Sequence, residues 1–217
     1  MSDRPATFER YLILDSGSVK KYAFLIAAGI LAACGSGSTD QDQQVNQFDQ
    51  LNAAANSLIA DNLPLVYTDL ASDIPSGTVG YAGYLVAYFE NTNDDITDAM
   101  AGRMELDVSF DAPEMVSGRA LGIYDEEGRR LTGTIDLTGG VLDRGGNPET
   151  DATFTFDGNG ALVDANNSRL SMTMLFEGDF LNAGATGLGG NILGTLTENG
   201  VGQTLEGLFI MEIDSPS

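Results

Sequence analysis

The stretch that decides the fold is residues 103–110, RMELDVSF, in which polar and apolar side chains alternate strictly. Successive side chains of a β-strand point to opposite faces, so this period of two predicts a strand with one dry face and one wet face. The same alternation recurs at 131–137, 170–176 and 205–211. From residue 79 onward the sequence therefore predicts an all-β domain.

Eight strands are predicted in this domain, which spans residues 79–213. They are placed at 79–89, 100–110, 115–124, 130–138, 151–157, 168–177, 187–197 and 203–213. Turn-forming residues separate several of them, at 91–95, 111–113, 125–128, 143–148, 157–160 and 199–200. Sequential hairpins leave two sheet edges, and closure into an antiparallel up-and-down barrel removes both.

Glycines inside the β-patterned runs support a strongly coiled barrel, because a strand glycine usually marks a bulge or a tight bend. They are Gly83, Gly118, Gly122, Gly133, Gly178, Gly190, Gly194 and Gly207. Eight strands leave an interior that side chains can fill or that can hold one small ligand. The many Phe, Met and Leu residues favour a filled interior, and a bound ligand is the alternative.

One amphipathic helix is predicted before the barrel, over residues 40–62. Thr39 or Asp40 is the expected cap, and Asn62 with Pro64 marks the end. The apolar stripe consists of Val45, Phe48, Leu51, Ala55, Leu58 and Ile59. We expect the stripe to bury against an end or a flank of the barrel, and binding to a partner is the alternative.

Residues 1–33 have the layout of an export signal. Lys20 and Lys21 precede a mostly apolar run at 22–33, which is shorter than the roughly 20 residues that span a bilayer. Residues 1–18 carry three acidic side chains where a positive segment belongs. A true translation start at Val19 is therefore our hypothesis.

Cys34 is the only cysteine of the chain and follows this apolar run directly. The sequence Leu31-Ala32-Ala33-Cys34 resembles the lipobox of bacterial lipoproteins. The resemblance implies cleavage before Cys34, a diacylglycerol on its thiol and an acyl chain, such as palmitate, on its new amino group. Two or more acyl chains anchor a protein stably, and residues 34–39 become a lipidated tether. A buried free cysteine in a short core helix is the alternative.

The charge of the chain is strongly negative, at −22. From Cys34 onward the chain keeps 6 of 10 basic and 29 of 32 acidic groups, a formal charge of −23. Such a chain is not expected to bind nucleic acid, and its membrane contact is expected through acyl chains. A solvated acidic surface is the favoured interpretation, and attraction of a cationic partner is the alternative.

The residue types that are missing limit the chemistry. The chain has no histidine and no tryptophan, and no lysine follows Lys21. These absences exclude nucleophiles paired with histidine, Schiff-base chemistry after the signal, and histidine ligation of zinc or haem. Carboxylate pairs remain, namely Glu105 with Asp107 and Asp125 with Glu126, but neighbouring acids are common on wet strand faces. We expect no enzyme activity, no catalytic residue and no cofactor.

Two glycine-bearing loops, 143–147 and 157–160, offer oxygen atoms of the kind that calcium prefers. Neither matches the twelve-residue calcium loop, and we interpret both as β-turns, with no metal site expected. The tyrosines Tyr81, Tyr84, Tyr88 and Tyr124 are candidates to line a barrel mouth or to ligate haem. The favoured interpretation is half-buried strand residues with a solvated hydroxyl.

The carboxy-terminal half resembles the β-barrel domain of transferrin-binding protein B and of smaller bacterial lipoproteins built on it. Three segments carry the resemblance: FEGDF at 176–180, GLGGNILG at 187–194 and EGLF at 206–209. It implies an eight-stranded barrel on a lipid tether. The larger receptors have two lobes, whereas the chain after Cys34 has room for one barrel and a helix, so transferrin binding is not carried over.

These observations lead us to expect a non-enzymatic cell-envelope lipoprotein, monomeric and lipid-anchored to the outer membrane. Its barrel would bind an unidentified protein or small molecule, in nutrient or metal acquisition by family analogy. Gly35 follows the cysteine, in place of the aspartate that retains some lipoproteins at the inner membrane. The alternatives are a structural surface lipoprotein without a specific ligand, and an integral outer-membrane barrel with apolar faces toward lipid.

Overall fold

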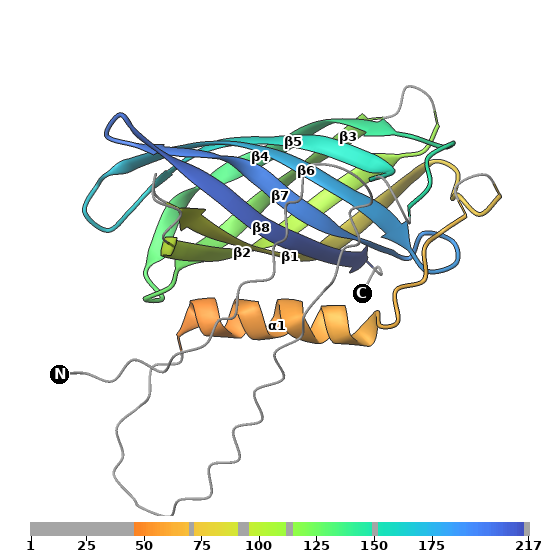
Figure 1. Cartoon of the computed structure of the whole chain (residues 1–217), viewed down its shortest axis with the longest axis horizontal. Coiled ribbons are helices and arrows are strands. Elements are labelled where there is room, and N and C mark those ends of the chain that lie inside the picture. The colour runs from red at the N-terminus through yellow and green to blue at the C-terminus, as the bar shows by residue number, and fades with distance from the viewer. Residues whose placement is uncertain (1–45, 70–71, 91–95, 112–114, 149–151, 215–217) are drawn as a thin grey trace, which may run out of the picture.

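The protein is an eight-stranded antiparallel barrel with one helix lying along its outer wall (Figure 1). The computed structural model describes residues 46–69, 72–90, 96–111, 115–148 and 152–214. The export signal, the start at Val19, Cys34 and the tether all lie outside the described residues.

The strands follow one another around the barrel in chain order. They are β1 (Thr78–Glu90), β2 (Ile96–Ser109), β3 (Met115–Asp125), β4 (Arg130–Leu142), β5 (Phe154–Val163), β6 (Arg169–Leu181), β7 (Gly187–Glu198) and β8 (Val201–Ile213). Each strand pairs with the next one, and β8 pairs with β1, from Tyr81↔Ile213 to Glu90↔Thr204. The predicted closed up-and-down barrel is confirmed.

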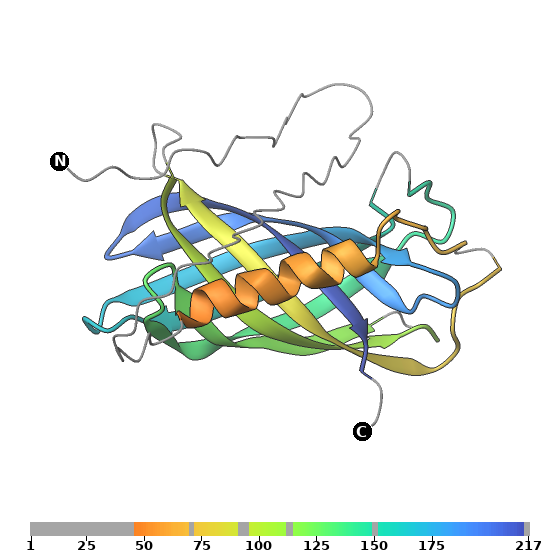
Figure 2. The ribbon, with the colours of Figure 1, turned by 90° about the horizontal axis from the view of Figure 1, so that it is seen from below.

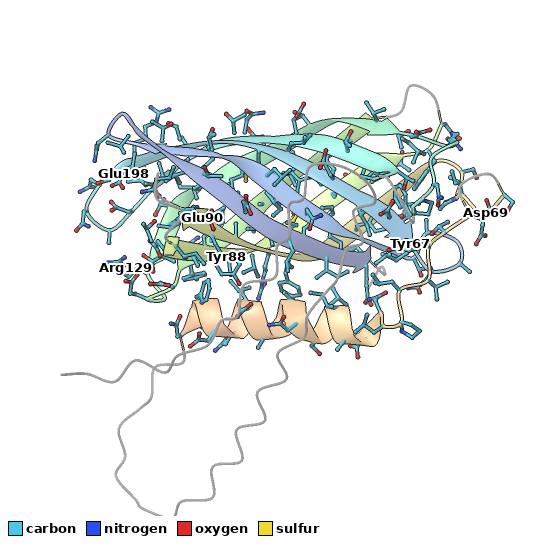
Figure 3. All side chains as sticks on the ribbon, viewed as in Figure 1. Tyr67, Asp69, Tyr88, Glu90, Arg129 and Glu198 are labelled. Atoms are coloured by element: carbon cyan, nitrogen blue, oxygen red, sulfur yellow. The ribbon has the colours of Figure 1, made fainter. Side chains whose placement is uncertain are left out.

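The barrel has two different ends. The hairpin end carries the connections 126–129, 164–168 and 199–200 and the beginning of the helix. The loop end carries residues 63–69 and 72–77 and the connections 143–148 and 182–186. Figure 3 shows Glu90, Arg129 and Glu198 at the hairpin end, and Tyr67 and Asp69 at the loop end.

The fifth strand corrects the sequence prediction. The expected turn at 157–160 is wrong, because these residues lie inside β5 and the chain reverses at 164–168. Gly158 and Gly160 face the interior, where added Cβ atoms would lie 2.7 Å from the Phe176 ring and from the Thr134 carbonyl oxygen. The glycines are thus required by close packing, and Asp157 and Asn159 are simply the outward residues between them.

Apolar side chains fill the barrel interior. Phe154, Phe156, Phe176, Phe180 and Phe209 form a continuous aromatic group, in which the rings of Phe156 and Phe176 stack with centroids 4.6 Å apart. Methionine, leucine and isoleucine side chains from the other strands complete one buried cluster. The composition favoured a filled interior, and the described residues form one.

Polar side chains cover the outer face of the strands. Thr132, Thr134, Asp136 and Thr138 are exposed on β4, while Leu131, Ile135 and Leu137 between them are buried. The alternative of an integral barrel required the reverse, with threonine and aspartate lining the lumen. In the structure the apolar side chains of β4 point into the barrel and the threonine and aspartate side chains point outward, which is the opposite arrangement.

The helix α1 (Gln47–Asp61) packs on the outside of the barrel (Figure 2). It begins later than predicted, because Asn46 has an extended backbone and its side chain accepts a hydrogen bond from the Phe48 amide at 2.9 Å. Residues 40–45 of the predicted helix lie outside the described residues. Within the described part of the chain, no helix has the length and apolar character needed to span a membrane.

The buried stripe of α1 consists of Phe48, Leu51, Ala55 and Ile59. It covers an apolar patch of the barrel wall, which includes Val86 of β1, Ala99 and Ala101 of β2, and Ile210 of β8. The flank contact predicted for the stripe is therefore confirmed, and α1 joins the hairpin end to the loop end.

Candidate functional site at the loop end

The filled interior directs the search for a binding site to the outside of the barrel. Tyr81 belongs to the filled interior. Its side chain is buried, and its hydroxyl donates a hydrogen bond to the Ala185 carbonyl at 2.7 Å. Burial raises the pKa of the Tyr81 phenol, which keeps it protonated. Tyr84, Tyr88 and Tyr124 pack instead in the cluster beneath α1. The four tyrosines are thus not gathered at a barrel mouth.

A short segment at 65–68 extends the barrel wall at the loop end. Tyr67 forms an antiparallel bridge with Leu181, the Thr68 amide donates to Phe180 at 3.0 Å, and the Asn182 amide donates to Val66 at 2.6 Å. The first residue of β5, Phe154, pairs with Gly178 of β6. Beyond Gly178, the 65–68 segment pairs with the same edge of β6 in place of β5. It thereby positions its own side chains beside the connections of the loop end.

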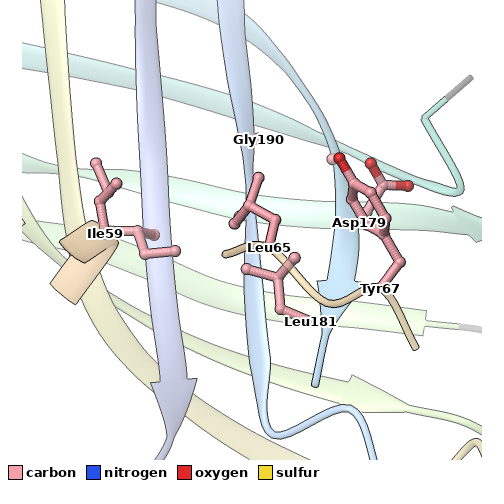
Figure 4. A pocket seen from close by; sticks show the side chains of 9 residues that line it. Ile59, Leu65, Tyr67, Asp179, Leu181 and Gly190 are labelled. Atoms are coloured by element: carbon pink, nitrogen blue, oxygen red, sulfur yellow. The ribbon is translucent and has the colours of Figure 1, made fainter. Parts of the chain in front are cut away.

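A small apolar hollow lies between this segment, α1 and the barrel wall (Figure 4). Its walls are Ile59, Leu65, Leu181 and Ile210, and its floor is the glycine backbone at 178, 189 and 190. A Cβ atom on Gly189 would lie 2.9 Å from Ile210 Cδ1, so a side chain there would fit only if the end of the Ile210 side chain moved. The free volume of about 20 Å³ is room for about one water molecule.

Asp179 lies at the edge of this hollow, beside the Tyr67 side chain (Figure 4). One of its carboxylate oxygens accepts hydrogen bonds from the backbone amide and the hydroxyl of Thr153, at 3.0 and 2.7 Å. Burial raises the pKa of Asp179, and the two hydrogen bonds oppose this shift. The carboxylate thus fastens the residue before β5 to the end of β6, which is a structural role.

A larger groove opens between residues 65–69 and the connection 144–148, with a volume of about 650 Å³. Its two walls are fixed independently. The 65–68 segment is held by β6, as described above. The opposite wall is a turn in which the Gly145 amide donates to the Asp143 carboxylate at 3.0 Å, and Arg144 donates to the Phe110 carbonyl at 2.7 Å.

The lining of the groove combines apolar and polar groups. Val66 is 53% exposed, and Leu65 and Pro148 add apolar surface. Asp69, Arg144 and Asn147 add charged and amide groups. Exposed apolar area supplies binding energy and a few polar groups supply orientation, so the groove has the composition of a binding surface for a peptide segment or a small molecule.

Two of the acidic residues considered as catalytic sites form ion pairs with arginine. Glu105 forms an exposed ion pair with Arg119 at 2.8 Å, and Asp125 pairs with Arg129 at 2.7 Å. The 143–147 turn borders the groove, whereas 157–160 is strand. Within the residues that the structure describes, no three His, Cys, Asp or Glu side chains are grouped to hold a metal ion.

A partly buried carboxyl group lies at the opposite, hairpin end. Burial raises the pKa of Asp98, the Ala99 amide opposes this by donating to its side chain at 2.8 Å, and the charges of Glu127 and Asp125 raise it further. Arg129, which donates to Asp125 and Glu127, balances this group of acids. The arrangement holds the 125–130 turn in place.

Sequence reasoning missed both the groove and the role of Asp179. The groove joins segments about 80 residues apart. Asp179 lies two residues beyond the predicted strand 168–177, and nothing in its neighbours indicates that it is buried. Its one signal was the resemblance segment FEGDF, in which a charged residue lies between glycine and phenylalanine.

No protein-family model and no curated protein sequence matches this chain.

Proposed function

We propose that this protein is a non-enzymatic lipoprotein of the bacterial outer membrane, anchored through acylated Cys34, whose barrel binds a protein or small molecule. The lipobox-like Leu31-Ala32-Ala33-Cys34 and the apolar run before it support the anchor. The resemblance to the barrel of transferrin-binding protein B supports a role in acquiring a nutrient or a metal, without transferrin as the ligand.

The observation that carries the binding role is the groove at the loop end. Because aromatic and aliphatic side chains fill the barrel, a ligand has to bind on the outer surface. The groove is a large open site with a mixed lining, whereas the hollow beneath α1 admits only about one water molecule. We therefore assign capture of the ligand to the wall formed by residues 65–69 and the turn formed by 144–148.

The lipid anchor is tested by intact mass spectrometry of protein extracted with detergent from bacterial envelopes. The expected species begins at Cys34 and carries acyl chains. A Cys34→Ser variant is expected to keep its signal and to lack acylation. An unmodified Cys34 in the envelope-derived protein would overturn the anchor, and a precursor that contains residues 1–18 would overturn the start at Val19.

The binding role is tested by native mass spectrometry of the same extracted protein. We expect a bound species that is lost in Val66→Arg, because Val66 is exposed in the groove. Val201→Arg is the matched control, since Val201 is 64% exposed at the opposite end. Loss in both variants would contradict a site at the groove. No bound species in any growth condition, with no uptake defect on deletion, would favour the structural lipoprotein.

A further inference from the structure

We propose that the turn between β7 and β8 is a site of self-modification, at which Asn199 converts to isoaspartate and aspartate by reaction with its own backbone. Asparagine is a chemically labile residue, and it is followed by glycine twice in the chain, at 159–160 and at 199–200. The two copies have different surroundings, and only the second is placed to react. The site is independent of the proposed function, because it uses no residue of the groove.

The reaction needs only the dipeptide and water. The Gly200 nitrogen loses its proton to solvent and attacks the Asn199 Cγ atom. The bond from Cγ to Nδ2 breaks, and the nitrogen takes a proton from solvent and leaves as ammonia. One water molecule then opens the five-membered imide, at Cγ to give aspartate or at the main-chain carbonyl to give isoaspartate. Glycine favours the attack because it has no Cβ beside the nitrogen.

Exposure of the side chain does not distinguish the two asparagines, since Asn159 and Asn199 are both exposed. The difference lies in what holds the backbone on either side of each one. The attacking nitrogen reaches Cγ only when the main chain between the two residues rotates, so pairing of that main chain with neighbouring strands opposes the reaction.

The backbone around Asn159 is held on both sides. Asn159 lies inside β5 and pairs with Asp136 of β4 and with Thr173 of β6. A Cβ atom on Gly160 would lie 2.7 Å from the Thr134 carbonyl oxygen, so this part of the strand is also closely packed. Rotation here breaks the pairing with two strands, and strands inside a sheet open only at high free energy.

The backbone around Asn199 is held much less. Asn199 and Gly200 are the whole connection between β7 and β8, beyond the last pair Glu198↔Val201. Their φ angles are 50° and 83°, and positive φ at both central residues is the requirement of a type I′ turn. A Cβ atom on Gly200 would meet no described atom within 4 Å. Rotation here disturbs only the end of one ladder, which opens at low free energy.

The modification should loosen the tip of this hairpin. Isoaspartate adds one carbon atom to the main chain of a two-residue turn, which no longer has the type I′ geometry. Either product also adds a carboxylate next to Glu198, and like charges repel. We therefore expect weaker pairing of Glu198 with Val201 and no change at the groove, which lies at the opposite end of the barrel.

The test compares the two dipeptides within one molecule. The freshly purified full chain is incubated in mildly alkaline buffer, folded or in guanidinium chloride, and then digested with trypsin. Cleavage after Arg144 and Arg169 places Asn159 and Asn199 in different peptides. Digestion in water labelled with heavy oxygen marks any conversion that occurs after unfolding, and fragment spectra locate the change and identify isoaspartate.

In the folded protein we expect conversion at 199 to exceed that at 159 by at least tenfold, because only β5 has to open first. In guanidinium chloride the two rates should agree within about twofold, since neither backbone is then paired. Asn199→Gln should lose the conversion at 199, because its ring closure is slower, whereas Asn159→Gln should leave it unchanged. Equal rates in the folded protein, faster conversion at 159, or an unmodified Asn199 after the unfolded chain has reacted would overturn the proposal.

Amide exchange tests the effect on the hairpin. Aged wild-type protein should exchange faster than fresh protein at Glu198 and Val201, whereas aged and fresh Asn199→Gln should be alike. Equal exchange in aged and fresh wild-type protein, with conversion at 199 shown by mass, would overturn the loosening of the turn.

Discussion

Gly190 faces Gly178 across the β6–β7 ladder, and a methyl group on Gly190 would lie 2.4 Å from the Gly178 Cα and 2.1 Å from the Glu177 carbonyl oxygen. The backbones of the two strands therefore approach more closely than any side chain allows. Both glycines belong to the segments that resemble transferrin-binding protein B, and both form the floor of the hollow beneath α1.

Gly190→Ala is expected to lower the free energy of unfolding by about 2–3 kcal/mol, because the obstructing atoms are backbone and cannot rotate away. Gly202→Ala is the matched control, since an added Cβ there meets nothing within 4 Å. It should change stability by less than about 0.5 kcal/mol. Urea unfolding measured by circular dichroism checks both, and equal effects would contradict the close approach.

Asp179 is expected to make stability depend on pH. Burial raises its pKa in the folded protein above the unfolded value near 3.8. Its contribution to stability is therefore fully present below the unfolded-state pKa and is lost as pH rises through the folded-state pKa. Asp179→Asn removes the titration and keeps an oxygen that can accept from Thr153. Relative to wild type, the variant should gain stability as pH rises from about 3 to 7.

The control for this prediction is Asp157→Asn, which changes an exposed carboxylate on the outer face of β5. Only the pH dependence that Asp179→Asn shows beyond this control is assigned to the buried carboxyl group. Chemical unfolding at several pH values provides the comparison. A flat difference for Asp179→Asn would contradict the raised pKa.

The aromatic group inside the barrel should dominate core stability. Phe176 is fully buried and contacts the rings of Phe156 and Phe209, with centroids 4.6 and 5.5 Å away. Phe176→Ala is expected to cost about 3–5 kcal/mol, since it leaves a cavity in a closed cylinder. Leu175→Ala, next to it on the outer face, should cost less than about 1 kcal/mol. Thermal unfolding distinguishes the two, and similar losses would argue against a filled interior.

The amino end of α1 depends on Asn46. Its side chain accepts from the Phe48 amide and donates to the Glu126 carbonyl, so Asn46→Ala removes both a cap and a link to the barrel. We expect a loss of about 1–2 kcal/mol and faster amide exchange in the first turn of α1. Asn56→Ala, on the exposed side of the helix, should be neutral or slightly stabilising. Unchanged exchange in Asn46→Ala would contradict the capping role.

The period of two was a reliable guide to most of the barrel, since only one strand was badly placed. It failed at β5 because Asp157, Gly158, Asn159 and Gly160 are turn-forming residues by composition. Local preference was overridden by the barrel, in which Gly158 and Gly160 pass against the neighbouring strands. The helix start was missed for a related reason, since Thr39, Asp40 and Asn46 are all acceptable caps and sequence alone does not rank them.

The sequence by itself determined an all-β domain with alternating faces, eight strands and one amphipathic helix, because these follow from the direction in which neighbouring side chains point. Only the tertiary structure decided which faces turn inward, where α1 lies, and which segments meet to form the groove. The physical reason is distance along the chain. The bridge between Tyr67 and Leu181 forms, and residues 65–69 come to lie opposite the 144–148 turn across the groove, only when the barrel has closed.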